Sequence, residues 1–374
     1  MPRTQLDNLI IFGDSMSDIG NKADTGLGMF ANTTGLMLTN ELGRFSDGKN
    51  WTDFLWEWAG GISMFHGDDP FDKKATAKVR SLAATQVHRS LSRDSNQDSG
   101  FGRPITYVNY AEGGAMGASD RPGTGLGTFR QQVTRYRKEL AACPGGLPGT
   151  TMFMIWFGLN DLVTNKRPHT DMERVVVEIF QLINELAMAT PGGRIHFTLL
   201  NLPDPADAVY YAPTKTQQSV WNLTNGARAF NAKLDEYTQL AHRDEQPIWL
   251  VDMFTLLKGI NRTLADNNLT ATAQAKAPPV DYPHVGPLPS TPLIPGPPIP
   301  RLAPPPGFTP SLAPLSSSSQ VNYQHAPLPP TPIATKDQKH PTSAVYRLMA
   351  REIGRGLVTR YELGVLSKSR ECKV

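Results

Sequence analysis

The sequence predicts an α/β protein: a three-layer α/β/α fold in which helices cover both faces of a five-stranded parallel sheet. Short apolar runs of strand length alternate along the chain with segments of helical periodicity, which is typical of βα units. Hydrophobic residues make up 39% of the 374 residues, enough for a sizeable core. Residues 271–335 break the pattern, because they hold 19 of the 32 prolines. The sequence therefore predicts one α/β domain with a long proline-rich insertion.

Five apolar or β-branched runs predict the strands. The first run ends abruptly in a Gly-Asp-Ser turn, and it is apolar enough to be buried on both faces of the sheet. Each later run is followed by turn residues and then by a helical pattern, as parallel strands require. The five predicted strands are residues 9–12, 105–108, 152–157, 194–200 and 247–251.

Helical periodicity predicts the elements between the strands. Asn50 can cap a first helix, in which Trp51, Phe54, Leu55 and Trp58 form one apolar face that we expect to pack in the core. Further helices are predicted over residues 126–142, 172–189, 220–237 and 342–363. In the last helix, Val345, Leu348, Met349 and Ile353 are expected to point inward.

Two stretches do not fit regular elements. Residues 62–104 are polar and weakly periodic, and we expect a surface insertion there. Residues 271–335 carry only three charged residues, and proline excludes regular helix, so disordered or extended polyproline-like chain is expected. The folded domain is therefore predicted over residues 1–270 and 336–374.

Composition excludes several classes of function. The chain has 37 basic and 34 acidic residues, a net charge of +3, so no nucleic-acid partner is expected. Cys143 and Cys372 lie far apart and are expected to be free thiols. No spacing of His, Cys or carboxylates suits a metal, and the glycine-rich stretches match no phosphate-binding fingerprint. Neither a metal nor a cofactor is therefore expected.

The chain's ends and hydropathy bear on localisation. Residues 1–8 are polar and contain no signal-peptide pattern. No apolar stretch of the sequence is long enough to be expected to form a transmembrane helix. Three localisations stay open: the protein is cytoplasmic, it is exported by a non-Sec route, or the sequence is that of a mature form whose leader has been removed.

The turn Gly13-Asp14-Ser15 is the first candidate for chemistry. It follows the first predicted strand, so Ser15 lies at the carboxyl edge of the sheet, where open α/β sheets bind ligands. Strand, sharp turn and serine form the geometry of an exposed nucleophile at the start of a helix. The alternative is an ordinary capped turn between a strand and a helix.

Serine needs an adjacent base, and His340 is the candidate. Asp337 precedes it by three residues and can orient the imidazole and stabilise the imidazolium that forms. The alternative is a solvated loop. The other seven histidines lack such a setting, and His196 is expected inside a strand.

Four motifs in this order resemble the GDSL, or SGNH, hydrolase superfamily over residues 9–360. They are Gly13-Asp14-Ser15, the glycine block that runs from Asn109 to Ala115, Gly158-Leu159-Asn160-Asp161, and Asp337-Gln338-Lys339-His340. The resemblance implies a flavodoxin-like fold and a serine esterase that acts through an acyl-enzyme, with Ser15, His340 and Asp337 as catalytic residues. It also implies an oxyanion hole made by the backbone N–H groups of Ser15 and Gly113 and the side-chain amide of Asn160. Gly114 stays open as the alternative to Gly113, and Asp14 is expected to position the turn.

Within the superfamily, the chain is most similar to the bacterial lipase/acyltransferase branch, which includes glycerophospholipid–cholesterol acyltransferases. The residues that carry this similarity are those of 12–20, Gly43-Arg44-Phe45-Ser46-Asp47-Gly48 with Trp51, those of 109–114, and Asn201-Leu202-Pro203-Asp204. The branch implies a lipid or phospholipid ester as substrate. This chain departs from the branch by Met16 in place of leucine, by its proline-rich insertion and by the absence of a leader.

Several functions stay open beside ester hydrolysis. The acyl group can pass to an alcohol acceptor instead of water, or the substrate can be an acetylated carbohydrate. Another alternative is that the protein is an interaction protein and not an enzyme. In that case the proline-rich stretch binds SH3-like or WW-like partners, and the hydrolase fold only carries it. Apolar residues spread through residues 288–315 can line an acyl chain or contact a lipid surface, or the stretch is only a tolerated loop.

Overall fold

The computed structural model of the protein describes most of the predicted domain. The described residues are 4–34, 37–40, 43–58, 106–121, 126–142, 147, 149–190, 194–208, 217–243, 246–267, 269–270, 331–332 and 339–363.

A five-stranded sheet lies at the centre of the described chain, and all its neighbouring strands are parallel. The order across the sheet is β3-β2-β4-β5-β6, so β2, which carries the Gly-Asp-Ser turn, lies between two neighbours. The strands are β2 (Asn8–Gly13), β3 (Thr106–Asn109), β4 (Thr150–Trp156), β5 (Arg194–Leu200) and β6 (Ile248–Val251). The prediction of a five-stranded parallel α/β sheet is confirmed.

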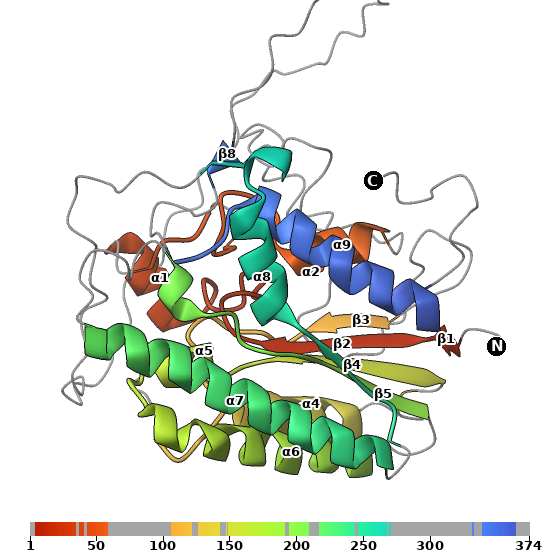
Figure 1. Cartoon of the computed structure of the whole chain (residues 1–374). Coiled ribbons are helices and arrows are strands. Elements are labelled where there is room, and N and C mark those ends of the chain that lie inside the picture. The colour runs from red at the N-terminus through yellow and green to blue at the C-terminus, as the bar shows by residue number, and fades with distance from the viewer. Residues whose placement is uncertain are drawn as a thin grey trace, which may run out of the picture.

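Helices cover both faces of this sheet, as Figure 1 shows. On one face lie α4 (Phe129–Ala141), α6 (Met172–Ala189) and α7 (Gln217–Arg243). On the other lie α2 (Trp51–Trp58), α8 (Met253–Arg262) and α9 (Ser343–Arg360). The three-layer arrangement is therefore the one predicted. Two short helices, α1 (Gly26–Thr33) and α5 (Leu159–Val163), lie in the loops near the carboxyl edge of the sheet.

The side chains of β2 alternate between two hydrophobic cores. Ile10 and Phe12 pack into the core beneath α4, α6 and α7, where Phe12 stacks on Tyr110. Leu9 and Ile11 point to the opposite core, which α2, α8 and α9 close. Because successive strand side chains face opposite ways, an all-apolar run such as this one requires cover on both faces.

Three helices differ in their bounds from the predicted ones, and α7 (Gln217–Arg243) is longer at both ends than the predicted 220–237. α4 begins at Phe129, because Thr128 caps it. The Thr128 side chain accepts the Gln131 N–H, and the Gln131 side chain accepts the Thr128 N–H, which completes a capping box. α9 ends at Arg360, because residues Tyr361–Leu363 form the strand β9, which pairs with β1 (Thr4–Leu6). Of the predicted inward residues, Val345, Met349 and Ile353 are buried, and Leu348 is partly buried against the same core. The inward face of α9 therefore agrees with the predicted one.

The two ends of the proline-rich stretch meet in the structure. The strand β7 (Leu269–Thr270) pairs in parallel with β8 (Thr331–Pro332). Residues 271–330 lie outside the described residues, as do the whole predicted surface insertion at 62–104 and both cysteines, Cys143 and Cys372. The division into a folded domain and an insertion thus stays a prediction.

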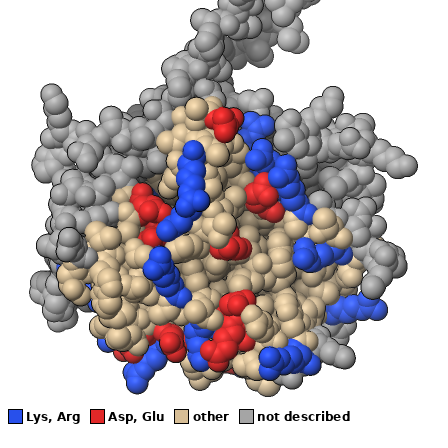
Figure 2. All heavy atoms as spheres, viewed as in Figure 1, with Lys and Arg blue, Asp and Glu red and all other residues tan. Residues whose placement is uncertain are grey.

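Charged side chains of both signs are interspersed on the face shown in Figure 2. This agrees with the near balance of 37 basic and 34 acidic residues in the sequence. Among the described residues, no helix is long and apolar enough to cross a membrane.

Candidate active site

Ser15 lies in a tight turn directly after β2. The Ser17 N–H donates to the Asp14 carbonyl at 3.0 Å, and the Met16 N–H donates to the Asp14 carboxylate at 3.0 Å. Gly13 allows this turn, since a Cβ there would lie 3.0 Å from Ser17 Oγ and 3.3 Å from the Trp156 carbonyl oxygen. The expectation that Asp14 positions the turn agrees with this geometry.

The helix expected immediately after Ser15 is absent, and that prediction is wrong. Residues 14–25 form turns, and α1 starts only at Gly26. The reason is local: the Asp18 carboxylate accepts the N–H groups of Gly20, Asn21 and Lys22, which would otherwise be available to a helix. Aspartate side chains that bond nearby backbone groups in this way compete with helix formation.

His340 lies beside Ser15, although 325 residues separate them in the sequence. His340 Nε2 is 2.8 Å from Ser15 Oγ, a hydrogen-bonding distance for a nucleophile and its base. The Phe45 ring packs on the imidazole with the two ring centres 5.1 Å apart. The Ser343 N–H donates to the Asp47 carboxylate, which fixes the start of α9 three residues after His340. Asp337 lies outside the described residues.

The side chain of Asn160 lies at the same turn. Its Nδ2 donates to Asp14 Oδ2 at 3.1 Å and to the Ala115 carbonyl at 3.2 Å, and its Oδ1 accepts from Thr164. The amide is therefore held in one orientation against the nucleophile turn and the glycine block. Gly158, with φ of +114°, allows α5 to begin sharply after β4 and brings Asn160 there.

The two glycines of the glycine block differ in their N–H groups. The Gly113 N–H donates to Asp18 Oδ2 at 2.7 Å. The Gly114 N–H has no hydrogen-bond acceptor among the described residues. A Cβ on Gly113 would meet the Phe45 ring at 2.4 Å, and Phe45 is the residue that packs on His340. The glycine turn therefore lies at the catalytic edge, and the alternative left open in the sequence, Gly114, is the one whose N–H is unoccupied.

Three carboxylates buried around the site resist ionisation. Burial raises the pKa of Asp14 to about 7, against the backbone hydrogen bond from Met16 and the charge of His340, which lower it. Burial likewise raises the pKa of Asp18 and that of Asp161 to about 6 each. Asp161 accepts the N–H groups of Gly117 and Ala118, and so fixes the chain that follows the glycine block.

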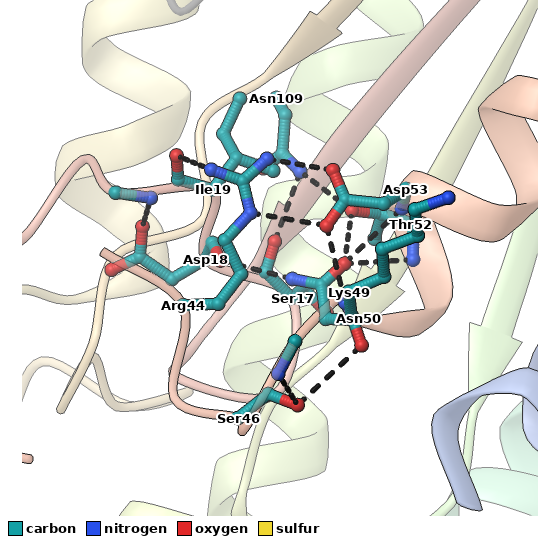
Figure 3. A network of polar contacts seen from close by, with 12 residues as sticks. Ser17, Asp18, Ile19, Arg44, Ser46, Lys49, Asn50, Thr52, Asp53 and Asn109 are labelled. Atoms are coloured by element: carbon teal, nitrogen blue, oxygen red, sulfur yellow. Dashed lines mark hydrogen bonds and ion pairs between the residues drawn. The ribbon is translucent and has the colours of Figure 1, made fainter. Parts of the chain in front are cut away.

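Further polar residues, which were not among the predicted site residues, support the turn that carries Ser15. Figure 3 shows Arg44 and Asp53 as a bidentate pair, with Arg44 Nη2 2.6 Å and Nε 3.0 Å from the two carboxylate oxygens. Arg44 also donates to the Ile19 carbonyl, and Asn50 donates to the Asp18 carbonyl. Arg44 lies in one of the motifs that carry the resemblance, but neither its burial nor its partner has a signal in the sequence.

Asn50 caps α2 as predicted, since its Oδ1 accepts from the N–H groups of Thr52 and Asp53. Trp51 is buried, and its indole N–H donates to Ser17 Oγ at 3.1 Å. The aromatic face of α2 therefore contributes to the core and also supports the nucleophile turn. His196 lies in β5, where its Nδ1 is 2.9 Å from the Tyr361 hydroxyl. No group of three potential metal ligands occurs within the described ranges.

Solved structures with a related arrangement include two carbohydrate esterases. An acetylxylan esterase from Geobacillus stearothermophilus, solved as a catalytic mutant, has 11% identity and a TM-score of 0.40 and covers 97% of each chain. A carbohydrate acetylesterase from Sinorhizobium meliloti has 12% identity and a TM-score of 0.35 over 65% of this chain and 83% of its own. Because both TM-scores are below 0.5, neither similarity supports a conclusion about the function of this chain.

The thermolabile hemolysin of Vibrio parahaemolyticus is 24% identical to this chain over 279 residues. The match covers 74% of this chain but 50% of the hemolysin, so the chain spans about half the length of this curated relative.

A family model matches most of the chain. The model of the GDSL-like lipase/acylhydrolase family matches residues 9–353, a span that begins in β2 and ends in α9. It includes the Ser15 turn, the glycine block, Asn160 and His340, which the fold brings together, and the resemblance seen in the sequence is thereby confirmed. The protein belongs to the GDSL-like lipase/acylhydrolase family.

Proposed function

We propose that the protein is a serine esterase that cleaves carboxylic esters through an acyl-enzyme, with Ser15 as nucleophile and His340 as general base. The observation that carries this proposal is the 2.8 Å distance between Ser15 Oγ and His340 Nε2. Serine attacks only when a base removes its proton, and this distance allows direct transfer.

The reaction proceeds in two steps. Ser15 Oγ attacks the carbonyl carbon while His340 takes the hydroxyl proton, and the protonated His340 then gives that proton to the departing alcohol. A water molecule next attacks the acyl-enzyme, His340 takes its proton, and the acid leaves as Ser15 regains its hydrogen. Asp337 is the proposed partner that orients the imidazole.

The oxyanion of each step is stabilised by groups already held around the turn. We assign this role to the Ser15 N–H, the Gly114 N–H and Asn160 Nδ2. Gly114 replaces the expected Gly113, because the Gly113 N–H is occupied by Asp18 and the Gly114 N–H has no acceptor among the described residues. Asn160 turns the amide hydrogen that it donates to Asp14 toward the oxyanion and keeps its hydrogen bond to the Ala115 carbonyl. Each such donor contributes about 3 kcal/mol to barrier lowering.

A lipid ester is the substrate class that we propose. The family's description as lipase/acylhydrolase supports it, and so do the exposed side chains of Leu27, Met29 and Phe30 on α1. On its inner side, α1 packs through Ala31 against the cluster that contains Phe45, and Phe45 contacts His340. The exposed apolar side chains of α1 are therefore separated from His340 by the cluster that contains Phe45. Transfer of the acyl group to an alcohol stays the alternative, because an alcohol can replace water in the second step.

The first experiment measures hydrolysis of p-nitrophenyl acetate. We expect Ser15→Ala and His340→Ala each to abolish measurable turnover, and the double variant to be no worse than either, because the two act as a unit. Ser219→Ala, which removes an exposed serine of α7, is the control and keeps wild-type turnover. If Ser15→Ala retains more than a few per cent of activity, Ser15 is not the nucleophile.

The second experiment tests the lipid substrate. Replacing Met29 and Phe30 by serine should leave turnover of p-nitrophenyl acetate unchanged and lower turnover of phospholipid vesicles several-fold. Met188→Ser removes a more exposed methionine near the end of α6, at the amino edge of the sheet, and should change neither. Equal effects on both substrates would contradict the lipid assignment, and ester products formed with added glycerol would instead favour acyl transfer.

A further inference from the structure

The Asp18 carboxylate joins the two loops that form the catalytic edge. Asp18 is fully buried and accepts four backbone N–H groups. Oδ1 accepts from Gly20 at 2.7 Å and from Asn21 at 2.6 Å, while Oδ2 accepts from Lys22 at 3.1 Å and from Gly113 at 2.7 Å. Three of the donors are in the loop that follows Ser15, and the fourth is in the glycine block 95 residues away.

Neighbouring contacts hold the same two loops in register. The Asn21 side chain donates to the carbonyls of Asn109 and Ala111, and Asn109 Nδ2 donates to the Ser17 carbonyl at 2.9 Å. Lys22 forms an ion pair of 3.0 Å with Glu112. Among these contacts, only that of Asp18 reaches Gly113, the residue directly before Gly114.

Gly114 thus lies between two residues, Gly113 and Ala115, that hydrogen bonds hold in place. On one side Asp18 holds the Gly113 N–H; on the other, the carbonyl of Ala115 accepts from Asn160. Gly114 itself has φ of +82°, a conformation that glycine adopts without strain. The direction of its N–H therefore depends on how its two neighbours are held.

We propose that Asp18 is a positioning residue of the oxyanion hole: its carboxylate fixes the Gly113 peptide so that the Gly114 N–H faces the reacting carbonyl oxygen. This inference rests on the proposed esterase function and deepens it. Asp18 does not touch the substrate. It acts by removing the freedom of a donor that must be in place before charge develops, which is the source of oxyanion stabilisation.

Asparagine cannot replace this carboxylate. Its side chain has one acceptor oxygen, and its NH₂ group would face two backbone N–H donors in either orientation. We therefore expect Asp18→Asn to release the Gly113 peptide or the loop that follows Ser15. The predicted result is a fall in kcat of at least tenfold with p-nitrophenyl acetate while KM changes less than twofold, because the lost interaction forms mainly in the transition state.

The experiment separates this role from a merely structural one. Titration with a fluorophosphonate to completion counts intact sites, and kcat is then expressed per site. A trifluoromethyl ketone, which forms an oxyanion on Ser15, should bind Asp18→Asn at least tenfold more weakly. Asp7→Asn is the control, since Asp7 accepts the Thr150 N–H at 2.8 Å at the opposite edge of the sheet. Unchanged kcat per site and unchanged ketone binding in Asp18→Asn would overturn the proposal.

A crystal structure of the wild-type protein phosphonylated on Ser15 covers the case in which Asp18→Asn does not fold. The expected structure keeps the bond between Asp18 and Gly113 and adds one from the Gly114 N–H to the phosphonyl oxygen. A Gly113 N–H that leaves Asp18 for the phosphonyl oxygen would overturn the inference. Labelling of a residue other than Ser15, or an active Ser15→Ala, would instead refute the proposed function.

Discussion

At the scale of single residues, the site consists of few reacting groups and many that hold them. Ser15 and His340 are in direct contact, whereas Asp14, Asp18 and Asp161 accept hydrogen bonds, among the described residues, from backbone N–H groups and from Asn160. The supporting carboxylates are buried and each accepts several N–H groups, so they order loops that have little regular structure. The chemistry is thus placed on loops whose geometry is fixed by side chains.

Asn160 gives a prediction at this scale. Removing its amide in Asn160→Ala takes away one oxyanion donor, and we expect kcat to fall about a hundredfold while KM stays near the wild-type value. Steady-state kinetics with p-nitrophenyl acetate measures both. Thr164→Val, which removes only the hydroxyl that donates to Asn160 Oδ1, should cost far less. A change confined to KM would place Asn160 in substrate binding.

The raised pKa of Asp14 predicts how stability changes with pH. The carboxyl releases its proton near pH 3.8 in the unfolded chain and near 7 in the folded protein. Between these values the folded state binds more protons, so raising the pH favours unfolding. Across this pH range, the shifted ionisation of Asp14 lowers the free energy of unfolding by roughly 4 kcal/mol.

Urea unfolding between pH 4 and pH 7 measures this effect. Asp14→Asn should lose stability less steeply than the wild type as pH rises, whereas Asp266→Asn, at an exposed carboxylate, should keep the wild-type slope. Parallel curves for Asp14→Asn and the wild type would show that burial does not shift the Asp14 pKa.

At the scale of elements, α2 and the loop before it form a support for the nucleophile turn. Arg44 and Asp53 are almost completely buried and bind each other through two hydrogen bonds, and Arg44 also holds the Ile19 carbonyl. A buried pair contributes little beyond what apolar residues would, but removing one partner leaves an uncompensated charge.

Asp53→Ala should therefore destabilise the protein by about 3–5 kcal/mol. Removal of Glu352, the partner of the exposed Arg355, should cost less than about 1 kcal/mol. Urea unfolding of the two variants at pH 7 makes the comparison. A loss below about 1 kcal/mol in Asp53→Ala would mean that Arg44 finds another partner.

At the scale of the whole molecule, the central sheet collects residues from the entire chain at one edge. The proline-rich stretch separates β7 from His340, yet the chain on either side of it meets in the β7–β8 pair. Because β7 and β8 hold the two ends together, the stretch forms a closed loop. The entropic cost of closing such a loop increases only slowly with its length.

We therefore expect the domain to tolerate replacement of residues 275–328 by a short Gly/Ser linker, which keeps β7 and β8. The thermal midpoint and the turnover of p-nitrophenyl acetate should stay within error of the wild type. Turnover of phospholipid vesicles then decides the role of the stretch. A large loss indicates a lid or a lipid-docking segment, and an unchanged rate leaves a tether or a partner-binding tail. Loss of short-ester turnover would contradict the expected tolerance.

The sequence by itself determined the sheet and the chemical identity of the site. The ends of the five strands were predicted to within two residues, because apolar runs bounded by turn residues are local signals. The motifs around Ser15, Asn160 and His340 likewise predict the reacting groups, since each stands directly after a strand or before a helix. These features depend on a few neighbouring residues, so they can be recognised without the fold.

Only the tertiary structure decided how these groups are held. The 2.8 Å contact of Ser15 with His340 spans 325 residues, and the proposal of Gly114 in place of Gly113 rests on a hydrogen bond from Gly113 to Asp18. The buried pair of Arg44 and Asp53 follows in the same way from packing and hydrogen bonding. A side chain's partner across the fold is set by geometry that no local pattern contains.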